Sequence, residues 1–309
     1  MKYYSELSYW RRYNAFLPED LQYREDNLPC EEYWKWKDFD IHLDRMKNPS
    51  SPVKVIVIHG AGANGRIIGL YGNFLYNQGY EYVAPDLIGY GLTKNPKKIN
   101  INYSAWVDSL SDFLDAELIK DNRPIVLLGL SVGGMLAYQV AAKNKNVKAL
   151  IVTTLADPRS QKVRDDLAAN LLLSRIGLPL SNFLKFFSDS INLPIKWVCK
   201  MDKITNEVSF SKIFSSDKLA GGSKIKLRFL RTYMNFIPAI EPENFTAAPV
   251  LFLQPEKDLW TTFQTSKAFY EKLNCLKKVV FLENCGHAPY EEPGLSTMKT
   301  QIIKFLEHL

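Results

Sequence analysis

From residue 50 onward, short apolar runs alternate with amphipathic stretches along the chain. The apolar runs predict β-strands, and because they are apolar almost throughout, we expect both faces of the sheet to be covered. The amphipathic stretches predict helices, and this alternation is typical of an α/β fold with a mostly parallel central sheet flanked by helices. The predicted strands are Val53–Ile58, Tyr80–Ala84, Pro124–Gly129, Val147–Thr154, Pro249–Gln254 and Lys277–Leu282, and the predicted helices are 66–77, 103–120, 132–143, 262–273 and 295–308.

The first fifty residues follow a different pattern. Between Glu32 and Asp44, large apolar and polar residues alternate, which predicts an antiparallel hairpin on the edge of the sheet. Residues 1–30 are rich in tyrosine and are predicted to be helical in part, with no functional site assigned to them. We interpret residues 1–50 as an N-terminal extension of the core.

The regular alternation breaks at Pro158 and resumes at Pro249. A connection between a strand and a helix usually takes only about 2–6 residues, so this interval must hold an inserted substructure. It contains helical patterns and no predicted strand. We therefore predict a helical cap over residues 159–246, inserted into a core formed by residues 1–158 and 247–309. The helical patterns are Leu171–Leu173, Phe183–Phe187 and Leu227–Phe236.

Composition favours a globular protein in a reducing compartment. Hydrophobic residues make up 46% of the chain and charged residues 23%, which is typical of a folded domain with a sizeable core. The four cysteines are not closely paired, so they indicate neither a zinc site nor a disulfide framework. The first residues lack the apolar segment of a signal peptide, and no apolar run approaches the ~18 residues needed to span a bilayer. These features predict a cytoplasmic location.

A serine lies where one predicted strand passes into a helix. The run Gly129-Leu130-Ser131-Val132-Gly133 directly follows the strand that ends at Gly129 and precedes a helical pattern. A tight turn between a strand and a helix exposes a serine to a pocket, and glycines two positions on either side remove side chains that would clash. We therefore predict Ser131 as a nucleophile.

Four histidines are candidates for the base that a nucleophilic serine needs. His42 lies in the predicted hairpin, His308 lies next to the C-terminus, and His59 belongs to another motif. His287 follows the last predicted strand on a short loop before the final helix. We predict His287 as the general base.

An acid must hold this histidine in the correct tautomer. Asp258 follows the strand Pro249–Gln254, and it gives the chain order Ser, Asp, His that is found in α/β-hydrolases. Glu256 in the same loop and Asp157 after the preceding strand are alternatives. Asp258 is the favoured candidate.

Two further motifs follow predicted strands. His59-Gly60-Ala61-Gly62 consists mostly of small residues, so its backbone can approach the nucleophile. We predict that the amides of Ala61 and Val132 form an oxyanion hole, whereas His59 itself has a structural role. In the motif from Asp86 to Gly91, we expect the carboxylate to cap local amides.

From Val53 to the C-terminus, the chain resembles the α/β-hydrolase superfamily, and within it the monoacylglycerol lipase and lysophospholipase-like esterases. The matching motifs occur in the same order: H-G-x-G, D-x-x-G-x-G, G-x-S-x-G, and a G-H pair after the last strand. The resemblance implies the α/β-hydrolase fold with an inserted helical cap. It also implies hydrolysis of a carboxylic ester through an acyl-enzyme, without a metal or an organic cofactor. The chain has Ala63-Asn64 where those lipases usually have a glutamate, and Leu130 where a histidine is common.

Other functions are compatible with the same residues. Carbon–carbon bond hydrolases, thioesterases and aminopeptidases share this machinery, and a hydrolase fold can also act as a small-molecule receptor with little turnover. Dehalogenases and epoxide hydrolases of this fold need an aspartate in place of Ser131. We expect the partner to be a small ester with an apolar acyl or alcohol part, and no nucleic acid.

The charge of the chain is concentrated in the predicted cap. The whole chain carries +6, and residues 159–246 contain 14 Lys and Arg against 8 Asp and Glu, so the excess lies entirely there. A solvated helical surface is the simpler interpretation. The alternative is that the cap attracts anionic amphiphiles, or makes transient contact with an anionic lipid surface, near an apolar entrance. Residues that could form the apolar part are Phe183, Phe186, Phe187, Trp197 and Phe236.

Overall fold

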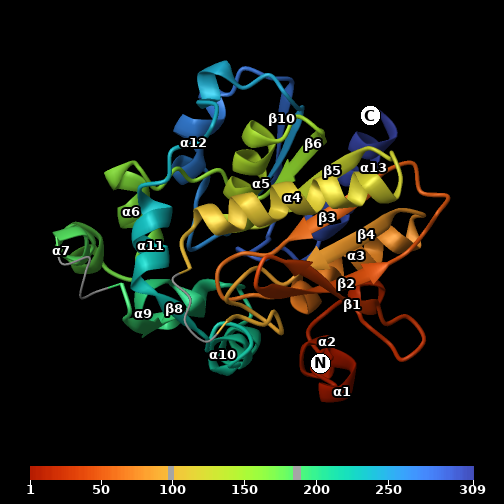
Figure 1. The fold of residues 1–309 in the computed structure, drawn as a ribbon, viewed down its shortest axis with the longest axis horizontal. Coiled ribbons are helices and arrows are strands. Elements are labelled where there is room, and N and C mark those ends of the chain that lie inside the picture. The colour runs from red at the N-terminus through yellow and green to blue at the C-terminus, as the bar shows by residue number, and fades with distance from the viewer. Residues whose placement is uncertain (97–100, 184–188) are drawn as a thin grey trace.

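A computed structural model describes residues 1–96, 101–183 and 189–309. An eight-stranded sheet forms the centre of the molecule, with the strand order β1-β2-β4-β3-β5-β6-β9-β10 (Figure 1). Strand β2 runs antiparallel to both of its neighbours, and the other neighbouring pairs are parallel. The strands are β1 (Cys30–Trp36), β2 (Phe39–Met46), β3 (Lys54–Ile58), β4 (Glu81–Pro85), β5 (Ile125–Gly129), β6 (Val147–Val152), β9 (Val250–Pro255) and β10 (Lys277–Leu282).

All six strands predicted after residue 50 are present, with ends that differ by at most two residues. Strands β3, β4, β5 and β9 are buried along their whole length, which agrees with their continuous apolar sequence. The largest difference is in β6, which ends at Val152 rather than Thr154. There the hydroxyl of Thr153 accepts a hydrogen bond from the backbone N–H of Ser131, so this part of the chain already belongs to the loop.

The predicted hairpin forms the edge of the sheet. Strands β1 and β2 pair along their length, and β2 joins the hairpin to β4. Ahead of the hairpin, three short helical turns confirm that residues 1–30 are helical in part. They are α1 (Tyr4–Leu7), α2 (Arg11–Asn14) and η1 (Glu19–Leu21).

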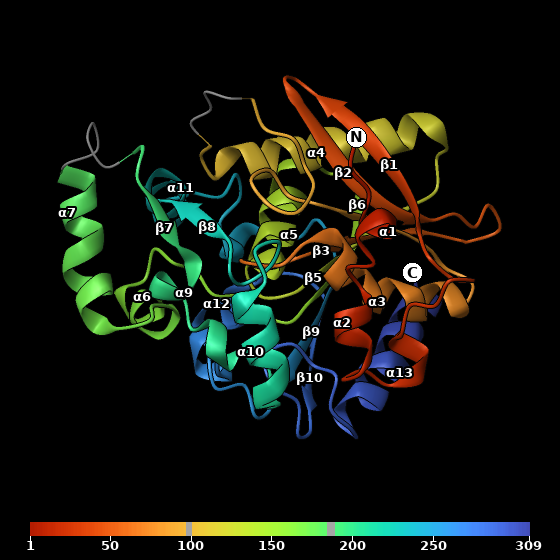
Figure 2. The same cartoon turned by 90° about the horizontal axis from the view of Figure 1, so that it is seen from below.

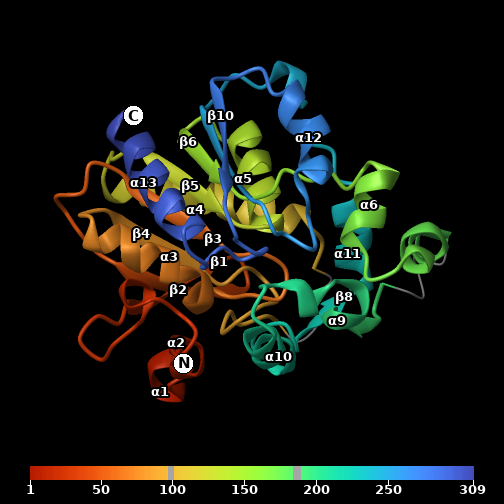
Figure 3. The ribbon, with the colours of Figure 1, turned by 180° about the vertical axis from the view of Figure 1, so that it is seen from behind.

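Helices cover both faces of the sheet, as the sequence predicted. Helices α4, α5 and α12 lie on the face seen in Figure 1, and α3 and α13 lie on the opposite face, which Figure 3 brings to the front. Within the described residues, no helix is long and apolar enough to cross a membrane. The bounds are α3 (Gly65–Asn77), α4 (Ser104–Lys120), α5 (Val132–Lys143), α12 (Phe263–Lys272) and α13 (Gly294–Glu307).

The segment between β6 and β9 is mainly helical and lies to one side of the sheet (Figures 1 and 2). The expectation that it holds no strand is wrong, because β7 and β8 form a small antiparallel sheet. Strands of three residues are too short to leave a periodic pattern in the sequence. The division into a core and a cap over residues 159–246 stays a prediction. The elements are α6 (Gln161–Leu167), η2 (Leu173–Gly177), α7 (Leu178–Phe183), β7 (Asn192–Pro194), α9 (Ile195–Val198), η3 (Met201–Lys203), α10 (Val208–Ser216), β8 (Lys224–Lys226), α11 (Leu227–Met234) and η4 (Pro242–Asn244).

The topology brings the loops after β3, β5, β6, β9 and β10 to one edge of the sheet, because these strands run parallel. In open α/β sheets, ligands bind outside the carboxyl ends of the strands. Every residue to which the sequence assigned a role in chemistry lies in one of these loops or in the first turn of the helix that follows.

Candidate active site

Ser131 lies in a tight turn between β5 and α5. Its backbone has φ +57° and ψ −129°, a conformation that non-glycine residues rarely adopt, so the turn holds this residue under strain. The flanking glycines are required for close packing. A Cβ on Gly129 would collide with the carbonyl of Gly133, and a Cβ on Gly133 would collide with the carbonyl of Ile58. The motif therefore folds as its spacing predicts.

A chain of hydrogen bonds joins Ser131 to His287 and Asp258. His287 Nε2 lies 2.8 Å from Ser131 Oγ, and His287 Nδ1 lies 2.8 Å from Asp258 Oδ2. His287 and Asp258 are only 2% and 4% exposed. Because an ionised carboxylate can only accept, His287 donates from Nδ1 and accepts the hydroxyl proton of Ser131 at Nε2.

The loop after β9 holds Asp258 as a carboxylate. Its Oδ1 accepts from the backbone N–H groups of Trp260 (2.7 Å) and Thr261 (2.8 Å), and its Oδ2 accepts from the Thr261 hydroxyl (2.8 Å). Burial alone raises the pKa of Asp258, but the neighbouring His287 and the hydrogen bonds from His287 and Thr261 outweigh burial and lower it.

Thr261 and Trp260 also contact this group, although the sequence predicted neither. The Thr261 hydroxyl lies 2.8 Å from Asp258 Oδ2 and 3.1 Å from His287 Nδ1, so it contacts both residues. The Trp260 ring packs on the His287 ring with the two centroids 4.7 Å apart. A threonine three positions after a loop aspartate is a sequence signal for a local turn in which the hydroxyl binds the carboxylate. The packing of Trp260 on His287, 27 positions away, leaves no local signal in the sequence.

The alternative acids lie away from His287. Asp157 instead pairs with Arg159, with 2.7 Å between Asp157 Oδ2 and Arg159 Nη2. Glu256 is exposed, and its backbone continues the pairing of β9 with β10. The geometry thus groups Asp258, and neither alternative, with His287.

The other three histidines form hydrogen bonds with groups other than Ser131. His42 Nε2 lies 2.7 Å from Glu31 Oε2, and His308 Nδ1 bonds the carbonyl of Lys304. His59 is fully buried, donates to the carbonyl of Gly60 and accepts from the backbone N–H of Leu87. Burial lowers the pKa of His59, so this histidine is neutral and fixes two loops, in agreement with a structural role.

The loop after β3 packs directly against the nucleophile turn. A Cβ on Gly60 would lie 2.9 Å from the Cβ of Ser131, so only glycine allows this approach. Asn64 caps α3 by accepting from the backbone N–H of Ile67. The loop thereby brings Ala61 beside Ser131 and Val132, and all three line one cavity. The role of the Ala61 and Val132 amides as an oxyanion hole stays a prediction.

Asp86 caps local amides, as predicted. Its two carboxylate oxygens accept from the backbone N–H groups of Gly65 and Leu92, each at 2.6 Å. It also accepts from the hydroxyl of Tyr4, which ties the N-terminal segment to this loop. Asp86 therefore stabilises the loops beneath the site.

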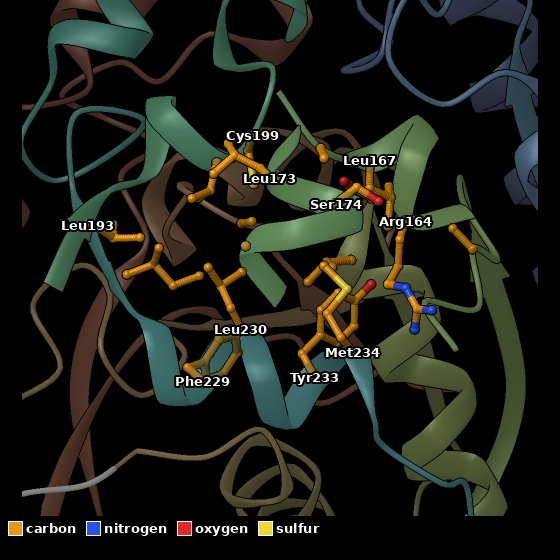
Figure 4. A pocket seen from close by; sticks show the side chains of 18 of the residues that line it. Arg164, Leu167, Leu173, Ser174, Leu193, Cys199, Phe229, Leu230, Tyr233 and Met234 are labelled. Carbon is orange, nitrogen blue, oxygen red and sulfur yellow. The ribbon is translucent and has the colours of Figure 1, made fainter. Parts of the chain in front are cut away.

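A cavity of about 210 Å³ opens at Ser131 and continues under the segment between β6 and β9. Most of its lining is apolar, and Arg164 is the only charged side chain among the described lining residues. Figure 4 shows Leu230, Tyr233 and Met234 pointing into it from α11, opposite residues of α6 and η2. The site can therefore hold an extended apolar group next to a hydrogen-bonded serine.

Comparison with known proteins identifies the family. The family described as serine aminopeptidase, S33, matches residues 50–294. The chain belongs to this family. It is therefore a hydrolase of the α/β-hydrolase fold, and the resemblance stated from its motifs is confirmed.

Two relatives of this S33 member are lipases by name. Lipase LipV of Mycobacterium tuberculosis is 34% identical over 119 residues, which cover 38% of this chain and 42% of LipV. The match thus spans less than half the length of LipV. Lipase 1 of Psychrobacter immobilis is 26% identical over 256 residues, covering 77% of this chain and 72% of that protein.

Solved structures share the fold of this S33 member. A soluble variant of monoglyceride lipase from Saccharomyces cerevisiae, determined with a substrate analog, superposes with a TM-score of 0.71 at 15% identity. The superposition covers 94% of this chain and 98% of that structure. This similarity confirms the predicted α/β-hydrolase fold.

One group of metal-ligand residue types occurs among the described residues of this S33 member, away from the serine. Donor atoms of Glu31, His42 and Asp44 lie within 4.8 Å of one another. Arg66 already pairs with both carboxylates of this group, because its guanidinium lies 2.5 Å from Asp44 and 3.2 Å from Glu31. We interpret the group as a buried ion-pair network.

Proposed function

We propose that the protein hydrolyses a carboxylic ester through an acyl-enzyme, with Ser131 as nucleophile, His287 as general base and Asp258 as the orienting acid. The observation that carries the proposal is the hydrogen-bonded series Ser131–His287–Asp258 at one end of an apolar cavity. The names of the relatives support it, since both are lipases.

In the first half of the reaction, Ser131 Oγ attacks the ester carbonyl while His287 Nε2 takes its proton. The negative charge that develops on the carbonyl oxygen is stabilised by the amides of Ala61 and Val132. The imidazolium of His287, stabilised by Asp258, then gives the proton to the leaving alcohol oxygen. The acyl group remains on Ser131.

In the second half, water replaces the alcohol. His287 removes a proton from this water, which attacks the acyl carbonyl, and then returns a proton to Ser131 Oγ as the acid leaves. The chemistry of these residues supplies each proton transfer, so no step requires a metal or an organic cofactor.

The family name suggests a second reaction, removal of an N-terminal amino acid. The substrate of an aminopeptidase carries an ammonium group, for which a carboxylate is the natural partner. The described lining of the large cavity offers Arg164 and no acidic side chain. The lining therefore favours an uncharged or anionic acyl group over a cationic one.

We also propose transient contact with an anionic lipid surface. Beside the cavity, α7 and the residues around it expose large apolar side chains, among them Phe183 (85% exposed) and Trp197 (60% exposed). The excess positive charge of residues 159–246 lies in the same segment.

The other aromatic residues predicted for the apolar entrance do not add to this surface. Phe236 packs on Tyr103, and Phe186 and Phe187 lie outside the described residues. A cytoplasmic location stays a prediction.

Labelling with a fluorophosphonate probe tests the proposed chemistry. We expect mass spectrometry to locate the probe on Ser131, and we expect no label on the Ser131→Ala variant. A panel of oxygen esters, thioesters, amino-acid amides and β-diketones, with acyl parts matched where the chemistry allows, then distinguishes the reactions that share this machinery. Failure of Ser131 to react, or turnover of amides alone, would refute the proposal.

A further inference from the structure

A second, smaller cavity of about 60 Å³ also opens at Ser131. Ser131 and Ala61 line both cavities, Val132 lines only the larger one, and His287 lines only the smaller one. The two cavities therefore lie on different sides of the nucleophile. The smaller one is on the side of the general base.

The position of His287 decides which part of an ester each cavity holds. The leaving oxygen must reach His287 Nε2, which lies 2.8 Å from Ser131 Oγ, to receive its proton. The bond between the acyl carbon and this oxygen breaks as the proton arrives, while the acyl carbon stays bonded to Ser131. The alcohol part thus lies in the cavity that contains His287, and the acyl part lies in the larger one.

We propose that the smaller cavity is a specificity site for a short, apolar alcohol. The assignment rests on the proposed esterase function and adds the identity of the leaving group to it. The smaller cavity's volume of about 60 Å³ is less than a third of the 210 Å³ of the larger cavity, so it takes the shorter part of the ester, an alkyl group of a few carbons.

The lining explains why the alcohol must be apolar. Apart from Ser131 and His287, the polar side chains among the described lining residues are Tyr71 and Tyr290. The Tyr71 hydroxyl already donates to the carbonyl of Pro289, and the Tyr290 hydroxyl interacts with the side chain of Thr205. A glyceryl group would bury two hydroxyls against leucine, isoleucine and phenylalanine side chains, which is unfavourable.

The N-terminal segment forms one wall of this cavity. Leu17 and Leu21 line it directly. Phe210 and Phe214 of α10 also line it, from the segment between β6 and β9. Residues 1–30, to which the sequence assigned no site, thus limit the size of the leaving group.

Contacts between α2 and α10 hold this wall in place. The Tyr13 ring packs on the Phe210 ring with centroids 5.4 Å apart, and the Tyr13 hydroxyl donates to Asp217 at 2.7 Å. Figure 2 shows the two helices side by side, far apart in sequence. The cavity is therefore bounded by elements whose positions are fixed by buried contacts.

The test compares esters of one acid, such as octanoate, with ethanol, propanol, hexanol and glycerol. We expect kcat/KM for the propyl ester to exceed that for the hexyl and glyceryl esters by about tenfold or more. Lengthening the acyl chain from butanoate to octanoate at constant alcohol should raise kcat/KM.

Two matched variants separate the cavities. Leu17→Ala, in the small cavity, should raise the ratio of hexyl to propyl ester turnover by about tenfold. Leu230→Ala, in the large cavity, should change the preference for acyl length and leave that ratio unchanged. Melting temperatures check that both variants fold. If one variant does not fold, the ester panel measured on the wild-type protein still tests the proposal.

The outcomes are distinguishable. A preference for hexyl or glyceryl esters, or a strict limit on acyl length with free choice of alcohol, would overturn the assignment and leave the esterase proposal intact. A glyceryl preference that Tyr290→Phe abolishes would show that the cavity recognises a hydroxylated alcohol. No turnover of any ester, together with no labelling of Ser131, would refute the proposed function itself.

Discussion

At the scale of residues, Thr261 and His287 bind the same carboxylate oxygen of Asp258. The Thr261 hydroxyl donates to Asp258 Oδ2, the atom that also accepts from His287 Nδ1. We infer that Thr261 is a positioning residue. Thr261→Val should lower kcat by roughly tenfold with little change in KM, because a hydrogen bond to a charged group is lost without loss of substrate contact.

The conservative variant provides the control for this prediction. Thr261→Ser keeps the hydroxyl and should retain most of the activity. Steady-state kinetics on one chromogenic ester measure both variants. An equal loss in the serine and valine variants would show that Thr261 acts through packing alone.

The choice of acid is also a matter of single residues. Asp258→Asn should lower kcat by about three to four orders of magnitude, because an amide in place of the carboxylate favours the wrong tautomer of His287. Glu256→Gln and Asp157→Asn serve as controls and should stay close to wild type, since neither side chain contacts His287. If Asp157→Asn were the damaging change, the assignment of Asp258 would be wrong.

At the scale of elements, a buried charge network joins the N-terminal segment, the hairpin and the loop after β4. Glu31 on β1 accepts from the backbone N–H groups of Tyr4 and Ser5 and lies 2.7 Å from His42 on β2. His42 Nδ1 lies 3.3 Å from Asp86. Burial alone lowers the pKa of His42, but the surrounding carboxylates of Asp86, Glu31 and Asp44 outweigh burial and raise it to about 10.

This raised pKa makes stability depend on pH. An unfolded histidine has a pKa of about 6.5, so folding favours the protonated form. The contribution of His42 is fully present below about pH 6.5 and is lost as pH rises through about 10. The difference in free energy of unfolding between wild type and His42→Gln should therefore shrink from pH 6 to pH 10. Urea unfolding of both proteins at each pH measures this difference. A difference that stays constant or grows would show that His42 is not stabilised as a cation in this network.

The elements differ in how far the sequence predicts them. The core strands were predictable because burial on both faces makes them continuously apolar. Strands β7 and β8 were not, since three residues carry no period and their pairing depends on contacts formed only in the fold. Ser131, His287 and Asp258 follow strands and could be found from chain order. Leu17 and Leu21 reach the site only through packing of α2 against α10, which no local pattern encodes.

At the scale of the whole molecule, the net positive charge of the chain lies in residues 159–246, the segment that covers the large cavity. If this charge attracts anionic amphiphiles, kcat/KM for an anionic ester should fall as salt rises, because exposed charges are screened over ~10 Å at 0.1 M ionic strength. A neutral ester of equal chain length is the control and should respond little. Equal salt responses for the two esters would show that the charged residues are merely solvated and do not attract the substrate.

The proposed mechanism requires Ser131 and His287 to act as one unit. The most direct measurement is kcat for ester hydrolysis by Ser131→Ala, His287→Ala and the double variant, each checked for folding by its melting temperature. We expect each single variant to lose on the order of 10⁴–10⁶ in kcat and the double variant to be little worse than either. Ester turnover by Ser131→Ala close to that of the wild type would contradict it.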